Sequence, residues 1–310
     1  MILLMDMGTS NTRLFLYDGE GVVDSEKGAF GAGSTLTEGR EYLISHVKGM
    51  LCDILTRNRL AEADVSAVIA SGMASSELGI CEVPHLNAPA NLSDLAKNVK
   101  KVTLSEITSI PFLVVPGVRV NEESGALRDM MRGEEVETFG ICDLCGIRGN
   151  AVLVLPGSHN KIIALDASRG IVDFTTSMSG EMMSALGGHT ILRGSVSYDF
   201  TLDETALREG AAFAEANGFG AALFHTRVLD KRGDVSRDAV SSFFCGVILS
   251  SDAALTRKAA NGGQVYIGGR ESLRHALAVL VGGDVHELPD EVSGNAVSHG
   301  LALISKMIFK

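Results

Sequence analysis

The chain has 310 residues, with 27 Lys and Arg against 38 Asp and Glu, so its formal net charge at neutral pH is −11. This length is enough for two domains with sizeable cores, and 45% hydrophobic with 21% charged residues is typical of a globular protein rather than a disordered one. The acidic balance and an aromatic content of 5% without tryptophan argue against a nucleic-acid partner, which would need a basic face.

The N-terminal segment lacks the basic flank and cleavage site of a signal peptide, and no apolar run approaches the roughly 20 residues of a membrane-spanning helix. Five cysteines, an odd number, fit a reducing cytoplasm better than a disulfide framework. We therefore expect a cytoplasmic protein without a membrane partner. Cys142 and Cys145 form a lone CxxC, which more often marks buried thiols than a metal or redox site.

The first predicted elements are strands at 2–5, 14–17 and 22–24, separated by turns at 8–11 and 18–21. A helix at 41–58, a strand at 65–70 and a glycine-containing loop at 71–79 follow. A second group of strands is predicted at 151–155, 162–165 and 171–174, again around two turns. The rest is mainly helical, at 180–192, 202–217, 238–258, 272–281 and 294–308, with one strand at 264–267.

The two strand groups match each other at a constant offset of 149 positions. Gly8 aligns with Gly157 and Asn11 with Asn160, and residues 8–24 contain six identities without a gap. An offset of about one domain length predicts two similar domains rather than a repeat array.

Each first turn of these groups carries glycine and hydroxyl residues, which suit a phosphate: Gly8, Thr9, Ser10 and Asn11 in one, and Gly157, Ser158, His159 and the nearby Lys161 in the other. Asp6, at the end of the first strand, is a candidate ligand for Mg²⁺. Gly268 and Gly269 join a strand to a helix and could let an adenosine approach the backbone. An ordinary tight turn is the alternative for either hairpin alone.

Glu134 and Glu135 follow Gly133 shortly before the second hairpin. A carboxylate near a bound hydroxyl can accept its proton during phosphoryl transfer. The alternative is a helix start with acidic residues near its positive end. The sequence contains no G-x-x-x-x-G-K-[ST] or G-x-S-x-G motif, which excludes a P-loop protein and a serine hydrolase of that type.

The order of these elements resembles the sugar-kinase/Hsp70/actin superfamily and, more narrowly, the 2-dehydro-3-deoxygalactonokinase family along almost the whole chain. The matching stretches are residues 5–13, 71–76, 115–117, 131–135, 155–161, 176–181, 243–252 and 268–269. The resemblance implies an α/β protein of two duplicated ribonuclease-H-like domains (the actin-like ATPase fold) around a nucleotide cleft, over residues 1–118 and 119–310.

The resemblance also implies ATP- and Mg²⁺-dependent phosphorylation of the 6-hydroxyl of 2-dehydro-3-deoxy-D-galactonate in galactonate breakdown. Asp6 and the two hairpins would bind the metal and the phosphates, and Gly268 and Gly269 would contact the adenosine. Glu134, with Glu135 as the alternate, would accept the proton. Expected substrate contacts are Ser71, Gly72 and Met73, with Arg13, Arg119 and Arg132 as candidates for the substrate carboxylate.

Two departures from the family pattern, Met7 and the pair Ile80–Cys81, bear on the exact sugar acid more than on the reaction. A kinase of another 2-keto-3-deoxy sugar acid, an ATPase switch of the actin or Hsp70 kind and a non-catalytic sugar sensor are the alternatives. The expected partners are the sugar acid and ATP, and a homodimer is compatible with the resemblance.

Overall fold

The computed structural model describes all 310 residues. The chain forms two compact units, the first made of residues 1–148, 167–173 and 294–310 and the second of residues 149–166 and 174–293. The division predicted between residues 118 and 119 falls inside the first of these units.

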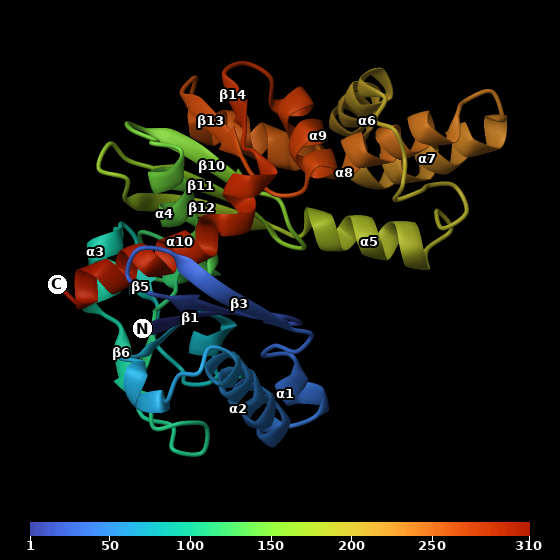
Figure 1. Cartoon of the computed structure of the whole chain (residues 1–310). Coiled ribbons are helices and arrows are strands. Elements are labelled where there is room, and N and C mark those ends of the chain that lie inside the picture. Colours follow the sequence, from blue (N-terminus) through green and yellow to red (C-terminus); the bar gives the residue numbers. More distant parts are fainter. The chain divides into compact units, whose positions relative to one another are not determined.

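A six-stranded sheet forms the centre of the first unit, in the order β3-β2-β1-β4-β7-β6 (Figure 1). Its strands are β1 (Ile2–Met7), β2 (Thr12–Tyr17), β3 (Val22–Gly28), β4 (Val68–Gly72), β6 (Lys100–Val102) and β7 (Phe112–Val114). The first three strands are an antiparallel meander, and β4 and β7 continue the sheet parallel to β1. The strands predicted at the N-terminus are confirmed, whereas β4 begins three residues later than predicted.

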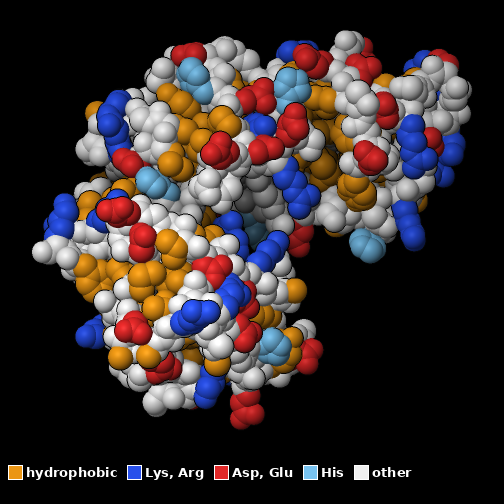
Figure 2. Space-filling model, viewed as in Figure 1, with side chains coloured by type: hydrophobic (Ala, Val, Ile, Leu, Met, Phe, Trp, Pro, Cys, Tyr) orange, Lys and Arg blue, Asp and Glu red, His pale blue; other side chains and the backbone are white.

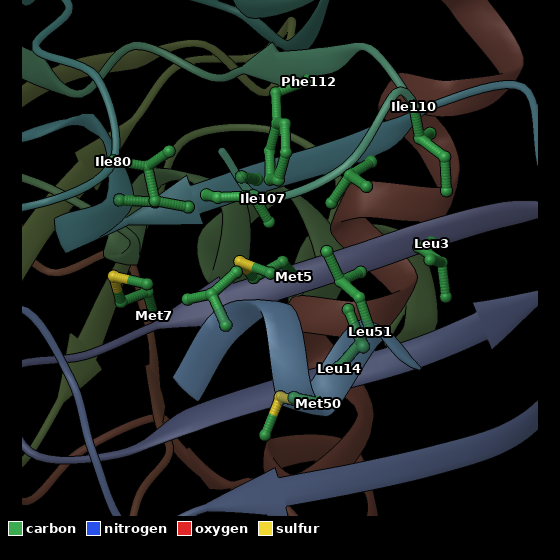
Figure 3. Close-up of a cluster of buried hydrophobic side chains, with 14 of the residues drawn as sticks. Leu3, Met5, Met7, Leu14, Met50, Leu51, Ile80, Ile107, Ile110 and Phe112 are labelled. Atoms are coloured by element: carbon green, nitrogen blue, oxygen red, sulfur yellow. The ribbon is translucent and has the colours of Figure 1, made fainter. Parts of the chain in front are cut away.

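Helix α2 (Arg40–Arg57) packs on this sheet through one apolar face. Leu43, Val47, Leu51 and Ile54 recur at helical spacing and are buried, as the periodicity predicts. In Figure 3, Met50 and Leu51 lie near Leu14 of β2, within the same cluster as alternate residues of β1. Because β1 is buried on both faces, its carboxyl end is held rigidly, and this is where the site residues begin.

The first unit also contains a three-stranded sheet, β5-β8-β9, and four further helices. The strands are β5 (Leu86–Asn87), β8 (Val118–Asn121) and β9 (Leu127–Met131), and the helices are α1 (Ser34–Thr37), α3 (Leu92–Lys97), α4 (Glu134–Leu144) and most of α10 (Asp290–Ile308). Short 3₁₀ turns lie at Glu62–Asp64 and Met73–Ser75. Both CxxC cysteines are free, and burial raises the pKa of the Cys142 thiol to about 12.

A five-stranded sheet, which lies in the second unit except for the start of β12, repeats the order β3-β2-β1-β4-β7 as β12-β11-β10-β13-β14. Its strands are β10 (Ala151–Leu155), β11 (Asn160–Leu165), β12 (Ile171–Ser177), β13 (Gln264–Ile267) and β14 (Val285–Glu287). Strand β10 pairs antiparallel with β11 and parallel with β13, as β1 pairs with β2 and β4. The predicted α/β architecture with two copies of one fold is therefore confirmed.

Five helices complete the second unit, and Figure 1 shows α6, α7, α8 and α9 gathered together. They are α5 (Ser179–His189), α6 (Glu204–Asn217), α7 (Phe219–Arg232), α8 (Arg237–Ala260) and α9 (Glu271–Val281). By length and composition α8 could cross a membrane, so the expectation that no segment approaches this size was wrong. Its most apolar 18-residue window is 78% buried inside the protein, however, which is the environment of a core helix.

Candidate active site

The first hairpin turn lies at the carboxyl end of β1. The Gly8 N–H donates to the Asn11 carbonyl over 2.8 Å, which closes a four-residue loop between the register partners Met7 and Thr12. The N–H of Gly33 donates to the Thr9 carbonyl over 2.8 Å and supports the turn from a neighbouring loop. Thr9, Ser10 and Asn11 are exposed, so this turn presents polar groups to a ligand.

Asp6 sits directly before this turn and pairs with Arg13 across the β1–β2 register. The Arg13 Nη2 and Nε donate to Asp6 Oδ2 over 2.7 and 3.0 Å. On the other side, Asp6 is the register partner of Ser71 in β4, whose buried hydroxyl makes no hydrogen bond. Gly72 has a φ of +70°, and a Cβ there would lie 2.5 Å from the carbonyl oxygen of Met7, the residue after Asp6. Backbone conformation and space both require glycine beside this carboxylate.

These groups fit a magnesium ion of the kind that kinases use. Mg²⁺ typically keeps several waters and takes one or two carboxylates together with substrate phosphates. Asp6 Oδ1 and the unpartnered Ser71 hydroxyl are oxygen donors at the end of one sheet. The structure has no group of three or more His, Cys, Asp or Glu side chains arranged to hold a metal, so the protein alone does not build a closed cage.

Arg132 fastens the loop that follows β4. Its Nη1 donates to the carbonyl and hydroxyl oxygens of Ser75, both over 2.6 Å, and its Nη2 donates to the Val83 carbonyl over 3.1 Å. This loop includes Met73, which begins the 3₁₀ turn after Gly72. Arg132 therefore binds the predicted substrate loop, and Arg13 binds Asp6.

Arg119, the third predicted arginine, lies in the same unit. The Arg119 Nε donates to Asn87 Oδ1 over 2.7 Å, and its side chain is only partly exposed. Burial, together with the charges of Arg132 and Arg119, lowers the pKa of His85 to about 4. His85 is therefore neutral at physiological pH, and the positive charge of this region resides on the two arginines.

The predicted acidic residues form the first turn of α4. Gly133 caps the helix, and Glu134 accepts a hydrogen bond from the Arg132 N–H over 3.1 Å. Glu135 is only 1% exposed, and its two oxygens accept from the Gly133 N–H over 2.9 and 2.8 Å. Burial and the neighbouring charge of Glu134 raise the pKa of Glu135 to about 8. The two glutamates therefore differ in accessibility, since Glu134 is partly exposed and Glu135 is buried.

The second hairpin turn is built differently from the first. Leu155 and Lys161 are register partners, so five residues lie between them instead of four. The Gly157 N–H donates to the side-chain Oδ1 of Asn160 over 2.9 Å rather than to a backbone carbonyl. The start of α5 rests on this turn, since the Glu181 N–H donates to the Ser158 carbonyl over 2.9 Å. A Cβ at Gly180 would lie 1.9 Å from the Gly157 carbonyl oxygen, so only glycine permits this approach.

Two basic side chains flank this second turn. Lys161 is 5% exposed, and its Nζ donates to the Thr176 hydroxyl over 2.7 Å. His159 is exposed at the tip and lies 2.9 Å from Glu181 Oε2 through its Nε2. Both side chains therefore have a partner inside the protein, Thr176 for Lys161 and Glu181 for His159.

Gly268 and Gly269 lie against the base of the second hairpin. Gly269 has a φ of +77°, and a Cβ there would lie 2.7 Å from the Pro156 carbonyl oxygen. A cavity of about 410 Å³ opens beside these elements, bounded by Gly157, Ser158 and Gly180 on one side and by Arg270 and Leu273 on the other. Met183, Phe200 and Phe244 contribute apolar wall. Apolar walls of this kind suit a planar ring system such as an adenine.

The structure adds residues that the sequence analysis did not single out. Glu137 lies one helical turn beyond Glu134, and burial with the charges of Glu134 and Asp6 raises its pKa to about 7. Asp252 of α8 contacts Asn160 of the second hairpin. The spacing of Glu134 and Glu137 was a signal for the first, and a lone acidic residue within an apolar helix was a signal for the second.

Comparisons with known proteins agree with this arrangement. The family model described as 2-keto-3-deoxy-galactonokinase matches residues 6–304. A 2-dehydro-3-deoxygalactonokinase of Escherichia coli (strain K12) is 27% identical over 262 residues, covering 82% of this chain and 80% of the relative. Among solved structures, a Sinorhizobium meliloti protein described as a 2-dehydro-3-deoxygalactonokinase superposes with a TM-score of 0.82 at 20% identity, over 100% of this chain and 99% of that one.

A more distant structure shares the fold alone. The activator of the 2-hydroxyisocaproyl-CoA dehydratase from Clostridium difficile, solved with bound ADPNP, has a TM-score of 0.52 at 13% identity, over 99% of this chain and 95% of that one.

Proposed function

The chain belongs to the 2-keto-3-deoxy-galactonokinase family, and from this premise we propose that it transfers the γ-phosphoryl group of ATP to the 6-hydroxyl of 2-dehydro-3-deoxy-D-galactonate. The Escherichia coli relative is named a 2-dehydro-3-deoxygalactonokinase, which supports this substrate. The observation that carries the proposal in this chain is the second hairpin turn, whose residues Gly157 and Ser158 border a cavity of about 410 Å³ that would hold an adenosine.

Glu134 is the proposed general base. A base must be ionised near neutral pH and must reach the substrate hydroxyl. Glu135 fails both requirements because it is buried and its pKa is near 8. Glu134 is partly exposed at the positive end of α4, where a helix stabilises negative charge. Glu134 therefore accepts the proton of the 6-hydroxyl, and Glu135 is assigned a structural role.

The second hairpin is the proposed site for the phosphates of ATP. Backbone N–H groups, the Ser158 hydroxyl and Lys161 offer donors to the phosphate oxygens, while the 410 Å³ cavity receives the adenosine. The protein is acidic overall, and on the face shown in Figure 2 Lys and Arg are interspersed with Asp and Glu. The positive potential that ATP requires is thus supplied locally by these groups.

Mg²⁺ is the proposed metal, held by Asp6 with Ser71 beside it. When bound, it neutralises charge on the phosphates and orients the transferred group. Asp6 also holds Arg13 across the β1–β2 pair, which keeps this carboxylate in a single position.

Arg119 is the proposed partner of the substrate carboxylate. Arg132 holds the substrate loop and Arg13 holds Asp6, whereas Arg119 uses only its Nε for Asn87. Its terminal nitrogens suit the two oxygens of a carboxylate. A cytoplasmic location, a homodimer and the absence of nucleic-acid and membrane partners stay parts of the proposal.

Product analysis tests this assignment. The enzyme is incubated with ATP, Mg²⁺ and 2-dehydro-3-deoxy-D-galactonate, and the phosphorylated position is read from ³¹P–¹H couplings. Phosphate at the 6-oxygen is expected. Phosphorylation of another hydroxyl would overturn the positional assignment, and release of free phosphate without a sugar product would favour an ATPase switch.

A further inference from the structure

Asp252 lies in the interior of α8 and reaches the second hairpin from beneath. It is 0% exposed, and its Oδ2 accepts a hydrogen bond from Asn160 Nδ2 over 2.7 Å and another from the Ser177 hydroxyl over 2.9 Å. A buried carboxylate is costly unless its oxygens are satisfied, yet Oδ1 of Asp252 has no hydrogen-bond partner. Asp252 is the one charged residue among the buried residues of α8.

The hydrogen bonds of Asn160 explain why a carboxylate is buried at position 252. Its amide can point either way, because the oxygen and nitrogen ends have nearly the same shape. A carboxylate only accepts hydrogen bonds, so Asp252 requires the NH₂ end of Asn160 to face it. The oxygen end must then face the hairpin, where it accepts from the Gly157 N–H over 2.9 Å.

This orientation matters only in the second hairpin. In the first, the Gly8 N–H is closed by the backbone carbonyl of Asn11, so the turn needs no side chain. In the second, the loop is one residue longer and depends on the Asn160 side chain. The direction of that amide therefore decides whether the turn closes.

Asp252 also orders the strand end and the helix beside the turn. Ser177, which donates to Asp252, lies 3.1 Å from the Ser179 hydroxyl at the start of α5. Thr176, the adjacent residue, accepts from Lys161 Nζ. One carboxylate thus links the phosphate turn, the segment that holds Lys161 and the helix whose first turn borders the nucleotide cavity.

We infer that Asp252 is a positioning residue for nucleotide binding, which acts by fixing the amide of Asn160 so that the second phosphate turn is closed before ATP arrives. The inference rests on the proposed function, in that the second hairpin binds the phosphates of ATP. Asp252 itself touches no substrate.

The test measures binding of a non-hydrolysable ATP analogue with Mg²⁺ by calorimetry, on the full chain. Asp252→Ala removes the acceptor, and we expect the dissociation constant to rise by about tenfold or more, the effect of losing a hydrogen bond to a charged group. Asp252→Asn keeps one acceptor oxygen, so its dissociation constant should lie between those of the wild-type protein and Asp252→Ala. Thr256→Val is the matched control, since it alters a buried side chain one turn along α8 that makes no hydrogen bond.

A reciprocal exchange separates positioning from folding. Asn160→Asp alone places two carboxylates against each other and should abolish measurable binding. Adding Asp252→Asn restores an amide facing a carboxylate, and the carboxylate introduced at position 160 still accepts from the Gly157 N–H. We expect this double variant to recover at least tenfold in affinity over Asn160→Asp.

Three results would overturn the inference: wild-type affinity in Asp252→Ala, an equal loss in Thr256→Val, or no recovery in the reciprocal pair. Failure of the proposed function is distinguishable from these, because wild-type protein would then bind the analogue and still phosphorylate no sugar acid.

Discussion

Replacing Glu135 by glutamine removes a buried acid while keeping an oxygen that accepts from the Gly133 N–H. The pKa of Glu135 is raised from 4.5 to about 8, so the folded protein holds a proton that the unfolded chain releases above pH 4.5. Stability therefore falls as pH rises from about 4.5 to about 8 and is unaffected by this group below that window. Glutamine has no such dependence.

The magnitude follows from proton affinity. Each tenfold difference in proton affinity between the folded and unfolded states corresponds to about 1.4 kcal/mol. The free energy of unfolding therefore falls by on the order of 5 kcal/mol across the full pH window. Between pH 6 and pH 8 the wild-type protein should lose about 2 kcal/mol relative to Glu135→Gln. Glu137, with a pKa of about 7, contributes in the same direction in both proteins and cancels from the difference.

Urea denaturation of both proteins at pH 5, 6, 7 and 8 measures this difference. Glu123→Gln, at an exposed loop position, is the matched control and should follow the wild-type curve. If the free energies of unfolding of Glu135→Gln and wild type differed by the same amount at every pH, the raised pKa of Glu135 would be refuted. If wild type instead became more stable relative to Glu135→Gln as pH rises, the pKa of Glu135 would be lowered rather than raised.

Three further substitutions have distinct expected outcomes. Glu134→Gln should lower kcat by about 10²- to 10⁴-fold without changing the affinity for an ATP analogue, and near-normal turnover would remove it as the base. Arg132→Lys cannot hold both Ser75 and Val83, so the KM for the sugar acid should rise while ATP binding is kept; an unchanged KM would contradict this role. Gly269→Ala places a Cβ 2.7 Å from the Pro156 carbonyl oxygen at a φ of +77°, so the unfolding temperature should fall and ATP binding should weaken. Gly282→Ala is the control: a Cβ there meets nothing within 4 Å, so only the unfolding temperature should fall.

Local patterns were sufficient to predict the two meanders and most helices. Their strands are marked by apolar runs and by glycine or asparagine at the turns, which are local signals. The 149-residue offset also appears in the structure, where β10 and β12 begin 149 positions after β1 and β3. Helix α7 was not predicted. A helix start at Glu134 was considered only as an alternative to a catalytic motif, and the structure has a helix there, α4.

The contacts that give the site its chemistry were beyond such patterns. Asn160 and Asp252 are 92 positions apart, and nothing in either local segment states that they meet. Similarly, Glu134 and Glu135 are adjacent and alike in sequence, and only burial separates an accessible carboxylate from an acid with a pKa near 8. The roles of the three arginines likewise depend on partners brought together by folding.

Sugar-dependent ADP release tests whether this chain is a sugar-acid kinase. The purified protein is given ATP and Mg²⁺ with 2-dehydro-3-deoxy-D-galactonate, with other 2-keto-3-deoxy sugar acids, or with no acceptor. The account predicts ADP release that depends on the acceptor and is fastest with 2-dehydro-3-deoxy-D-galactonate. ADP release at the same rate without any acceptor would contradict it, as would turnover with another sugar acid alone.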